Sequence, residues 1–240
     1  MLEKVTSEYQ YVKAFGLHGP TRPVKKIKFN RDGDMFFTCG DDKLIIAWDI
    51  ECNKLGVYYG QGACKSLAVS YNTEYVAGAF STEGIEIFNA MTGVSVRKVD
   101  FPNLRCNNID FNLGDTEIAV VLVGTSKSFV NTYDFKTLLG TTGTPLPKCS
   151  IEFREDIPSQ ATYGYLNEHL YVTTFNKKNN HGNIYKYDVN GSEPTEIAKH
   201  VKLHTGEIFS FAFSKDFTML ATCSNDCKCL VIDPNTFETF

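Results

Sequence analysis

Apolar and polar residues alternate along this chain in short segments that are separated by clusters of turn-forming residues. Residues 24–29 alternate loosely, whereas residues 35–39 and 43–48 are nearly continuous apolar runs. Alternation with period two predicts a strand with one covered face, and a short continuous run predicts a strand covered on both faces. Turn formers follow, as in residues 30–34 and 40–43. No apolar period of 3.6 residues is sustained over three turns, so the pattern predicts an all-β chain.

This strand-and-turn unit recurs along the chain. An aromatic or aliphatic residue followed by Asp or Asn closes each unit, and the closing pairs are Trp48-Asp49, Phe88-Asn89, Tyr133-Asp134, Tyr187-Asp188 and Ile232-Asp233. Their spacings are 40, 45, 54 and 45 residues, close to the period of about 40–45 residues of WD-repeat propeller blades. The repeat predicts one all-β domain, a WD-repeat β-propeller with five degenerate blades at about 18–60, 61–101, 102–144, 158–200 and 201–240. The irregular residues 140–149 account for the longest spacing and are expected to form an insertion loop.

Blades of this type are commonly held by a buried, hydrogen-bonded set of His, Ser or Thr, Asp and Trp, which stabilises only when every member is satisfied. The residues expected in such sets are His204, Ser210 and Asp226 in unit five and Asp42 and Trp48 in unit one. Lys26 takes the Ser position of unit one in this alignment. Units two to four have almost none of the set, so their stability is expected to come mainly from apolar sheet faces.

Composition and charge narrow the functional classes. With 240 residues and 42% hydrophobic residues, the chain can bury a large core. No stretch approaches the roughly 18 apolar residues of a membrane span, and residues 1–8 lack the apolar region of a signal peptide. The net charge of −4 argues against a protein whose main activity is binding nucleic-acid phosphates, and it leaves only a local basic patch open. We expect no direct, sequence-specific nucleic-acid contact. We therefore expect a cytoplasmic protein whose eight cysteines are all reduced and unligated.

A search for reactive groups finds no complete motif. His200 and His204 have the spacing of zinc ligands on a helix, but no helix is expected there. Cys223, Cys227 and Cys229 form a C-x3-C-x-C pattern without a second half. The chain also lacks a phosphate-binding glycine loop and a nucleophile signature. We therefore expect no metal, no cofactor and no enzymatic activity, and the propeller pattern instead favours protein binding.

Several segments resemble the WD-repeat family of subunit I of eukaryotic translation initiation factor 3. Residues 26–38, Lys-Ile-Lys-Phe-Asn-Arg-Asp-Gly-Asp-Met-Phe-Phe-Thr, are similar to the first blade of that family, and residues 55–60, Leu-Gly-Val-Tyr-Tyr-Gly, to its passage into blade two. Residues 91–93 with 104–111 look like the next passage, and residues 214–226 like blade five. Blade two departs from the family pattern, because Gly60-Gln61 and Phe88-Asn89 replace its Gly-His and Trp-Asp.

The resemblance implies a non-catalytic scaffold of the initiation complex that delivers messenger RNA and initiator tRNA to the small ribosomal subunit. It implies that the propeller binds initiation factor 3 subunits B and G, gripping the C-terminal helix of the former, with acidic positions of blade five taking part. By motif, those positions are Asp216 and Asp233 here. Carboxylates on rigid turns can bond Arg side chains of a partner helix. Both residues can equally be ordinary turn carboxylates.

Two further alternatives stay open. The repeats are also similar to those of other WD-repeat adaptors, such as kinase-receptor-associated or splicing-linked propellers. The resemblance implies a ring of seven blades, whereas this sequence stops after its fifth closing pair. We therefore expect a C-terminally truncated chain whose first and fifth blades do not meet, and closure by five blades is the rival arrangement.

Overall fold

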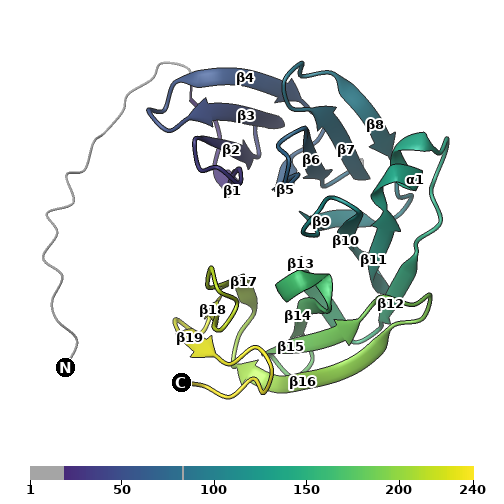
Figure 1. Cartoon of the computed structure of the whole chain (residues 1–240). Helices are drawn as coiled ribbons and strands as arrows, with labels where there is room; N and C mark the ends of the chain where they lie inside the picture. Colours follow the sequence, from purple (N-terminus) through teal and green to yellow (C-terminus); the bar gives the residue numbers. More distant parts are fainter. Residues whose placement is uncertain (1–18, 83) are drawn as a thin grey trace, which may run out of the picture.

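The computed structural model describes residues 19–82 and 84–240, which form five antiparallel sheets around a common axis (Figure 1). Each sheet is one blade, and its first strand in the sequence lies nearest the axis. The prediction of an all-β propeller is thus confirmed. Residue 18, the first of the expected blade one, and the N-terminal residues 1–8 lie outside the described residues.

The strands of each blade follow one another in the sheet in sequence order. Blade one comprises β1 (Val24–Phe29), β2 (Met35–Gly40), β3 (Leu44–Asp49) and β4 (Lys54–Tyr59), and blade two comprises β5 (Cys64–Val69), β6 (Tyr75–Phe80), β7 (Gly84–Asn89) and β8 (Ser95–Val99). Blade three comprises β9 (Arg105–Phe111), β10 (Glu117–Val123), β11 (Ser128–Asp134) and β12 (Cys149–Phe153). Blade four comprises β13 (Asp156–Tyr163), β14 (Leu170–Asn176), β15 (His181–Asp188) and β16 (Thr195–His204). Blade five has β17 (Ile208–Phe213), β18 (Leu220–Ser224) and β19 (Cys229–Ile232) within the described residues.

The outer strands differ from the expected unit boundaries. β12 follows the irregular residues 140–149 and pairs with β11, so this segment lies inside blade three, past the expected boundary at 144. β16 likewise extends to His204, past the expected boundary at 200. The closing pairs mark the end of each third strand, and the fourth strand follows after a loop of variable length. Sequence spacing therefore locates the third strand better than the fourth.

The segment between β11 and β12 also contains a short helix that the pattern did not predict. α1 (Phe135–Gly140) begins at Asp134, whose side chain accepts a hydrogen bond from the Thr137 amide at 2.7 Å. Phe135 and Leu138 are buried against the cluster between blades two and three. A single capped turn of this kind is too short to produce a helical period in the sequence.

The hydrophobic core lies between successive blades, in four clusters. β10 shows why its sequence is a continuous apolar run. Ile118, Val120 and Leu122 pack toward blade two, whereas Ala119 and Val121 pack toward blade four, and all five side chains are at most 1% exposed. When both faces of a strand are buried, neither face carries polar residues, so the strand sequence is apolar throughout.

Buried polar side chains also join the innermost strands. Each of these strands has a register shift, and Lys26, Ser66, Asn108, Gln160 and Ser210 occupy the equivalent position after it. Asn108 donates to Ser66 Oγ of blade two at 3.1 Å and accepts from the Ala161 amide of blade four at 3.1 Å. Gln160 in turn accepts from the Phe211 amide of blade five at 3.2 Å. These bonds fix the angle between neighbouring blades.

The five blades form an arc, with blade one and blade five at its two ends (Figure 1). The four hydrophobic clusters join blades one to two, two to three, three to four and four to five. Among residues 19–82 and 84–240, no such cluster joins blade one to blade five.

Candidate partner-binding surface

The expected polar set of blade five is built around His204, which is 1% exposed. Its Nδ1 lies 2.9 Å from Asp226 Oδ2, and its Nε2 lies 2.8 Å from Thr222 Oγ1. Asp226 also accepts hydrogen bonds from the Thr205 and Lys228 amides at 3.1 and 3.0 Å. Burial by itself would raise the pKa of Asp226, but the bonds from His204 and the two amides outweigh it and hold the pKa at about 2.

In blade one, Trp48 Nε1 donates to Thr38 Oγ1 at 2.9 Å, and Asp42 accepts from the amides of Thr21 and Leu44 at 3.1 and 3.3 Å. Thr38 on β2 and Thr222 on β18 therefore hold the hydroxyl position of the set, on the second strand of the blade. Ser210 lies on the first strand instead, where it donates to Gln160 Oε1 at 3.3 Å. The structure thus places Ser210 between blades rather than beside His204.

Blade four replaces the missing set with a different one, centred on Asp156. This half-buried carboxylate accepts hydrogen bonds from Thr174, Asn176, Asn183 and Tyr185 at 2.7–2.9 Å. Burial would raise the pKa of Asp156, but the four donors lower it below its ordinary value. A polar network with four donors therefore exists in a unit whose sequence has almost none of the WD-type residues.

Asp216 and Asp233 lie at the same end of blade five. Asp216 is in the β17–β18 turn and Asp233 follows β19, and in an antiparallel sheet these two connections are on one side. Asp216 is exposed and Asp233 is half-buried. The structure thus brings both candidate residues to the same rim, next to the corresponding turns of blade four.

The Asp216 carboxylate is held by its own turn. Its Oδ1 accepts from the Ser214 hydroxyl at 2.6 Å and from the Thr218 hydroxyl and amide at 2.8 and 3.2 Å. These bonds lower the pKa of Asp216 to about 2. Asp233 is oriented similarly, since its Oδ1 accepts from the amides of Asn235 and Thr236 at 2.6 and 3.1 Å. Within the described part of the chain, the Oδ2 atoms of both residues accept no hydrogen bond.

Aromatic side chains stand beside these carboxylates. Phe217 follows Asp216 with a φ of +58°, a left-handed conformation that is strained for a bulky residue. Its ring centroid lies 5.8 Å from that of Tyr165 and 5.2 Å from that of Phe213. Tyr165 is 57% exposed. These rings and Asp216 line a cavity of about 330 Å³ between blades four and five.

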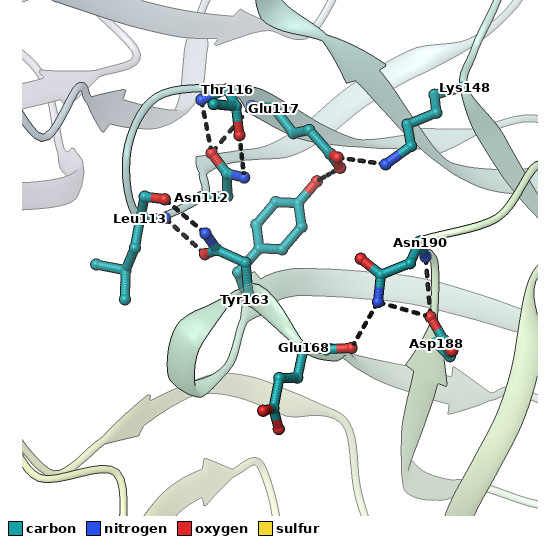
Figure 2. A network of polar contacts seen from close by, with 10 residues as sticks. Asn112, Leu113, Thr116, Glu117, Lys148, Tyr163, Glu168, Asp188 and Asn190 are labelled. Carbon is teal, nitrogen blue, oxygen red and sulfur yellow. Dashed lines mark hydrogen bonds and ion pairs between the residues drawn. The ribbon is translucent and has the colours of Figure 1, made fainter.

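The loop that carries Tyr165 is fixed on both sides (Figure 2). Asn167 accepts from the Leu113 amide at 2.7 Å and donates to the Leu113 carbonyl at 2.5 Å, which ties the loop to blade three. Asn190 donates to the Glu168 carbonyl at 3.3 Å and to Asp188 at 2.9 Å. The loop therefore presents Tyr165 and Glu168 at the cavity in a defined position.

Blade three and blade four are joined nearby by a second polar group in Figure 2. Glu117 pairs with Lys148 and accepts from the Tyr163 hydroxyl at 3.2 Å. Burial raises the pKa of Tyr163 well above its ordinary value, and the negative charge of Glu117 adds to this effect. The Tyr163 hydroxyl therefore stays protonated and donates to Glu117 across the interface between blades three and four.

A buried lysine forms the deep end of the cavity. Lys186 is 6% exposed, donates to Asn235 Oδ1 at 2.9 Å and lies 5.5 Å from the centre of the Tyr171 ring. Burial lowers the pKa of Lys186, whereas the charges of Glu168 and Asp233 oppose that change. The cavity thus has an acidic rim, aromatic walls and one internal cation. An Arg or Lys side chain of a partner can lie on the rings and reach the rim carboxylates.

Neither a metal site nor a membrane-spanning helix is found in residues 19–82 and 84–240. No group of three or more His, Cys, Asp or Glu side chains there is placed to hold a metal ion. No helix in that part is long and apolar enough to cross a membrane. His200, one of the pair with zinc-like spacing, contacts the Phe237 carbonyl through Nδ1 at 3.1 Å, whereas His204 contacts Asp226 and Thr222.

Comparisons with known proteins agree with the propeller fold. The family model described as "WD domain, G-beta repeat" matches residues 10–49 and 196–233, the regions of the two WD-type polar sets. Eukaryotic translation initiation factor 3 subunit I of Neosartorya fischeri is 30% identical over 220 residues, which are 88% of this chain. The chain thus carries WD repeats and is similar to eukaryotic translation initiation factor 3 subunit I proteins over most of its length.

Two other subunit I proteins are also similar to this chain over most of its length. The Xenopus tropicalis and Schizosaccharomyces pombe proteins are 25% and 26% identical, each over 92% of this chain. The chain spans 66%, 62% and 67% of the lengths of the Xenopus, Neosartorya and Schizosaccharomyces relatives. Among solved structures, the β-propeller domain of Myceliophteria thermophila Cps50 (Swd1) has a TM-score of 0.69 at 16% identity, with 89% of this chain and 66% of that chain covered. That likeness supports the fold alone.

Sequence reasoning found the two carboxylates but missed the groups around them. Tyr165, Glu168 and Lys186 come from blade four, whose sequence carries almost none of the WD-type polar set. One signal was present in blade five. When the turns of units one and five are aligned, Phe217 stands where unit one has Gly33, which has a φ of +73°. A large aromatic residue at a position that favours glycine does not stabilise the turn itself. It therefore indicates a side chain that makes a contact outside the turn.

Proposed function

We propose that the chain is a non-catalytic scaffold of eukaryotic translation initiation factor 3 that binds partner subunits through the rim of blades four and five. The observation that carries the proposal is the pairing of two oriented carboxylates, Asp216 and Asp233, with an aromatic cavity at one rim. The similarity to subunit I proteins over about 90% of this chain supports the place in the initiation complex.

The partners are proposed to be subunits B and G of the factor, the former bound through its C-terminal helix and the latter on an adjoining surface. A basic residue of the helix would lie on the exposed ring of Tyr165 and reach the carboxylates of Asp216 and Asp233. Because the two turns already hold the carboxylates, little side-chain entropy is lost on binding. Contact with the small ribosomal subunit, messenger RNA and initiator tRNA would follow indirectly, through the assembled factor.

Charge reversal at the rim tests this proposal. The double substitution Asp216→Lys with Asp233→Lys should weaken binding of a synthetic peptide of that C-terminal helix by roughly tenfold to hundredfold, because repulsion adds to the lost attraction. Isothermal titration calorimetry at two salt concentrations measures this effect. The matched control is Asp32→Lys with Asp49→Lys at the equivalent positions of blade one, which should leave peptide affinity unchanged. Equal affinities of the wild-type and rim variants, with the fold intact, would refute the assignment.

A second experiment separates the proposed function from that of other WD-repeat adaptors. The wild-type chain is expressed with an affinity tag and its co-purified proteins are identified by mass spectrometry. We expect subunits B and G of initiation factor 3. Recovery of a kinase-signalling or splicing complex in their place would favour the adaptor alternative.

A further inference from the structure

Two cysteines lie on the face of blade five that points away from blade four. Along β18 the buried Leu220, Thr222 and Ser224 face blade four, so the exposed Ala221 and the half-buried Cys223 lie on the opposite face. On β19 the same face carries Cys229 and Val231, both exposed. Within the described part of the chain, no strand packs on this face.

The register of the hairpin places these cysteines directly opposite each other, since Cys223 on β18 pairs with Cys229 on β19. The next pair toward the turn is hydrogen-bonded, because the Ser224 amide donates to the Lys228 carbonyl at 3.2 Å. Pairs alternate in an antiparallel ladder, so Cys223 and Cys229 form a non-hydrogen-bonded pair. The Cα atoms of such a pair are about 4.5 Å apart, within the range of about 4.4–6.8 Å that a disulfide spans.

We propose that Cys223 and Cys229 are a redox-reactive dithiol, which peroxide oxidises to a reversible cross-strand disulfide. Both thiols are free in the resting state. Cys223 Sγ lies 3.5 Å from the Ser210 carbonyl on β17, to which it donates a weak hydrogen bond. Rotation about χ1 of Cys223 breaks this hydrogen bond and turns its Sγ away from β17 and toward Cys229 on β19.

The remaining cysteines are not placed for this reaction. Cys39, Cys64, Cys106 and Cys149 are buried, and burial raises the pKa of Cys106 far above its ordinary value, which suppresses its thiolate. Cys52 and Cys227 are exposed, but both lie in turns and have no cysteine opposite them in a ladder. Among the described cysteines, only the half-buried Cys223 and the exposed Cys229 combine solvent access with a cysteine directly opposite in the ladder.

The chemistry balances with hydrogen peroxide as the oxidant. The exposed Cys229 thiolate attacks one peroxide oxygen, a sulfur–oxygen bond forms, the oxygen–oxygen bond breaks and hydroxide leaves. The Cys223 thiolate then attacks the sulfenic sulfur, so the disulfide forms and a second hydroxide leaves. Two thiols lose two electrons and two protons, and peroxide becomes two water molecules. A dithiol reductant reverses the reaction by exchange.

Peptide mapping tests the proposal directly. The folded chain is treated with hydrogen peroxide, free thiols are blocked, and trypsin digestion without reductant is followed by mass spectrometry. Trypsin cleaves after Lys228 and so separates Cys223 from Cys229. We expect a disulfide-linked peptide pair in the wild type, in C227S and in C52S, and its disappearance after dithiothreitol or in C223S and C229S. C227S is needed because Cys227 shares a peptide with Cys223.

Three outcomes would overturn the proposal. The first is a linked pair that persists in C223S, because Cys227 would then be the true partner. The second is overoxidation of Cys229 in the wild type without any cross-link. The third is absence of both products while Cys52 reacts. Far-UV circular dichroism of each serine variant, which should match the wild type, shows that the loss of the linked pair comes from the missing thiol.

Discussion

At the scale of single residues, the WD-type set of blade five shows that the strand carrying a hydroxyl residue determines which group it bonds. His204 contacts Thr222 on β18, while Ser210 on β17 bonds Gln160 of blade four. Both hydroxyl residues belong to the same blade, and only the strand on which each lies separates a partner of His204 from a contact between blades. The Asp226 carboxylate is the charged centre of the set, and its low pKa makes it testable.

Replacing Asp226 with Asn should lower stability at neutral pH and flatten the dependence of stability on pH below about 4. The folded pKa of about 2 lies below the unfolded value near 4, so ionised Asp226 stabilises the fold above pH 4. This contribution is lost as the pH falls through about 2. Thermal unfolding midpoints recorded between pH 6 and pH 2 give the comparison. Parallel curves for the two proteins would show that Asp226 contributes nothing.

At the scale of a blade, equivalent stability comes from different chemistry. Blade five uses His204 and Asp226, blade one uses Trp48 with Thr38, and blade four gathers four donors on Asp156. All three arrangements satisfy buried polar atoms next to the second and third strands. A degenerate repeat therefore keeps its sheet without keeping its sequence signature, because what the blade requires is satisfied hydrogen bonding.

Asp156→Ala should destabilise the protein by roughly 2–4 kcal/mol, because it leaves the donors of Thr174, Asn176 and Tyr185 without an acceptor. The neighbouring Glu155 is exposed, so Glu155→Ala is the matched control and should change stability by less than about 0.5 kcal/mol. Urea unfolding followed by Trp48 fluorescence measures both. Equal stabilities of the two variants would mean that the Asp156 network is dispensable.

At the scale of the whole molecule, the blades are held by the clusters between them. Successive blades bury the faces of their strands against each other, as Ile118 of β10 is buried against blade two and Ala119 against blade four. The end blades have one face without such a neighbour among the described residues, and large apolar groups such as Phe209 are 60% exposed there. We propose that the five blades nevertheless behave as one domain.

Truncation of a buried interface residue tests that view. Ile118→Ala, between blades two and three, should cost about 2–5 kcal/mol and shift the unfolding of all blades together. Val231→Ala on the uncovered face of blade five should have an effect below about 1 kcal/mol, since Val231 is already 41% exposed. Hydrogen exchange read by mass spectrometry reports on each blade separately. Loss of protection limited to blades two and three would show independent units.

The sequence by itself determined the fold class and the number of units, whereas Asp216 and Asp233 were suggested only by the resemblance to the subunit I family. Those properties depend on local chemistry: alternation of apolar residues, turn formers and the recurring closing pairs, of which Ile232-Asp233 is the last. The position of Asp216 and Asp233 on one side also follows from strand parity, because every hairpin reverses the chain direction.

Only the tertiary structure decided what surrounds those residues. Lys186 and Tyr165 come from another blade, and their distance from Phe217 depends on the angle at which blade four meets blade five. That angle is set by packing and by bonds such as Gln160 to Phe211, which leave no periodic signal. Strand register is likewise a property of the folded hairpin. The C-x3-C-x-C pattern in the sequence does not show which two thiols face each other. The pairing of Cys223 with Cys229 follows from the three-residue turn that separates Ser224 from Lys228.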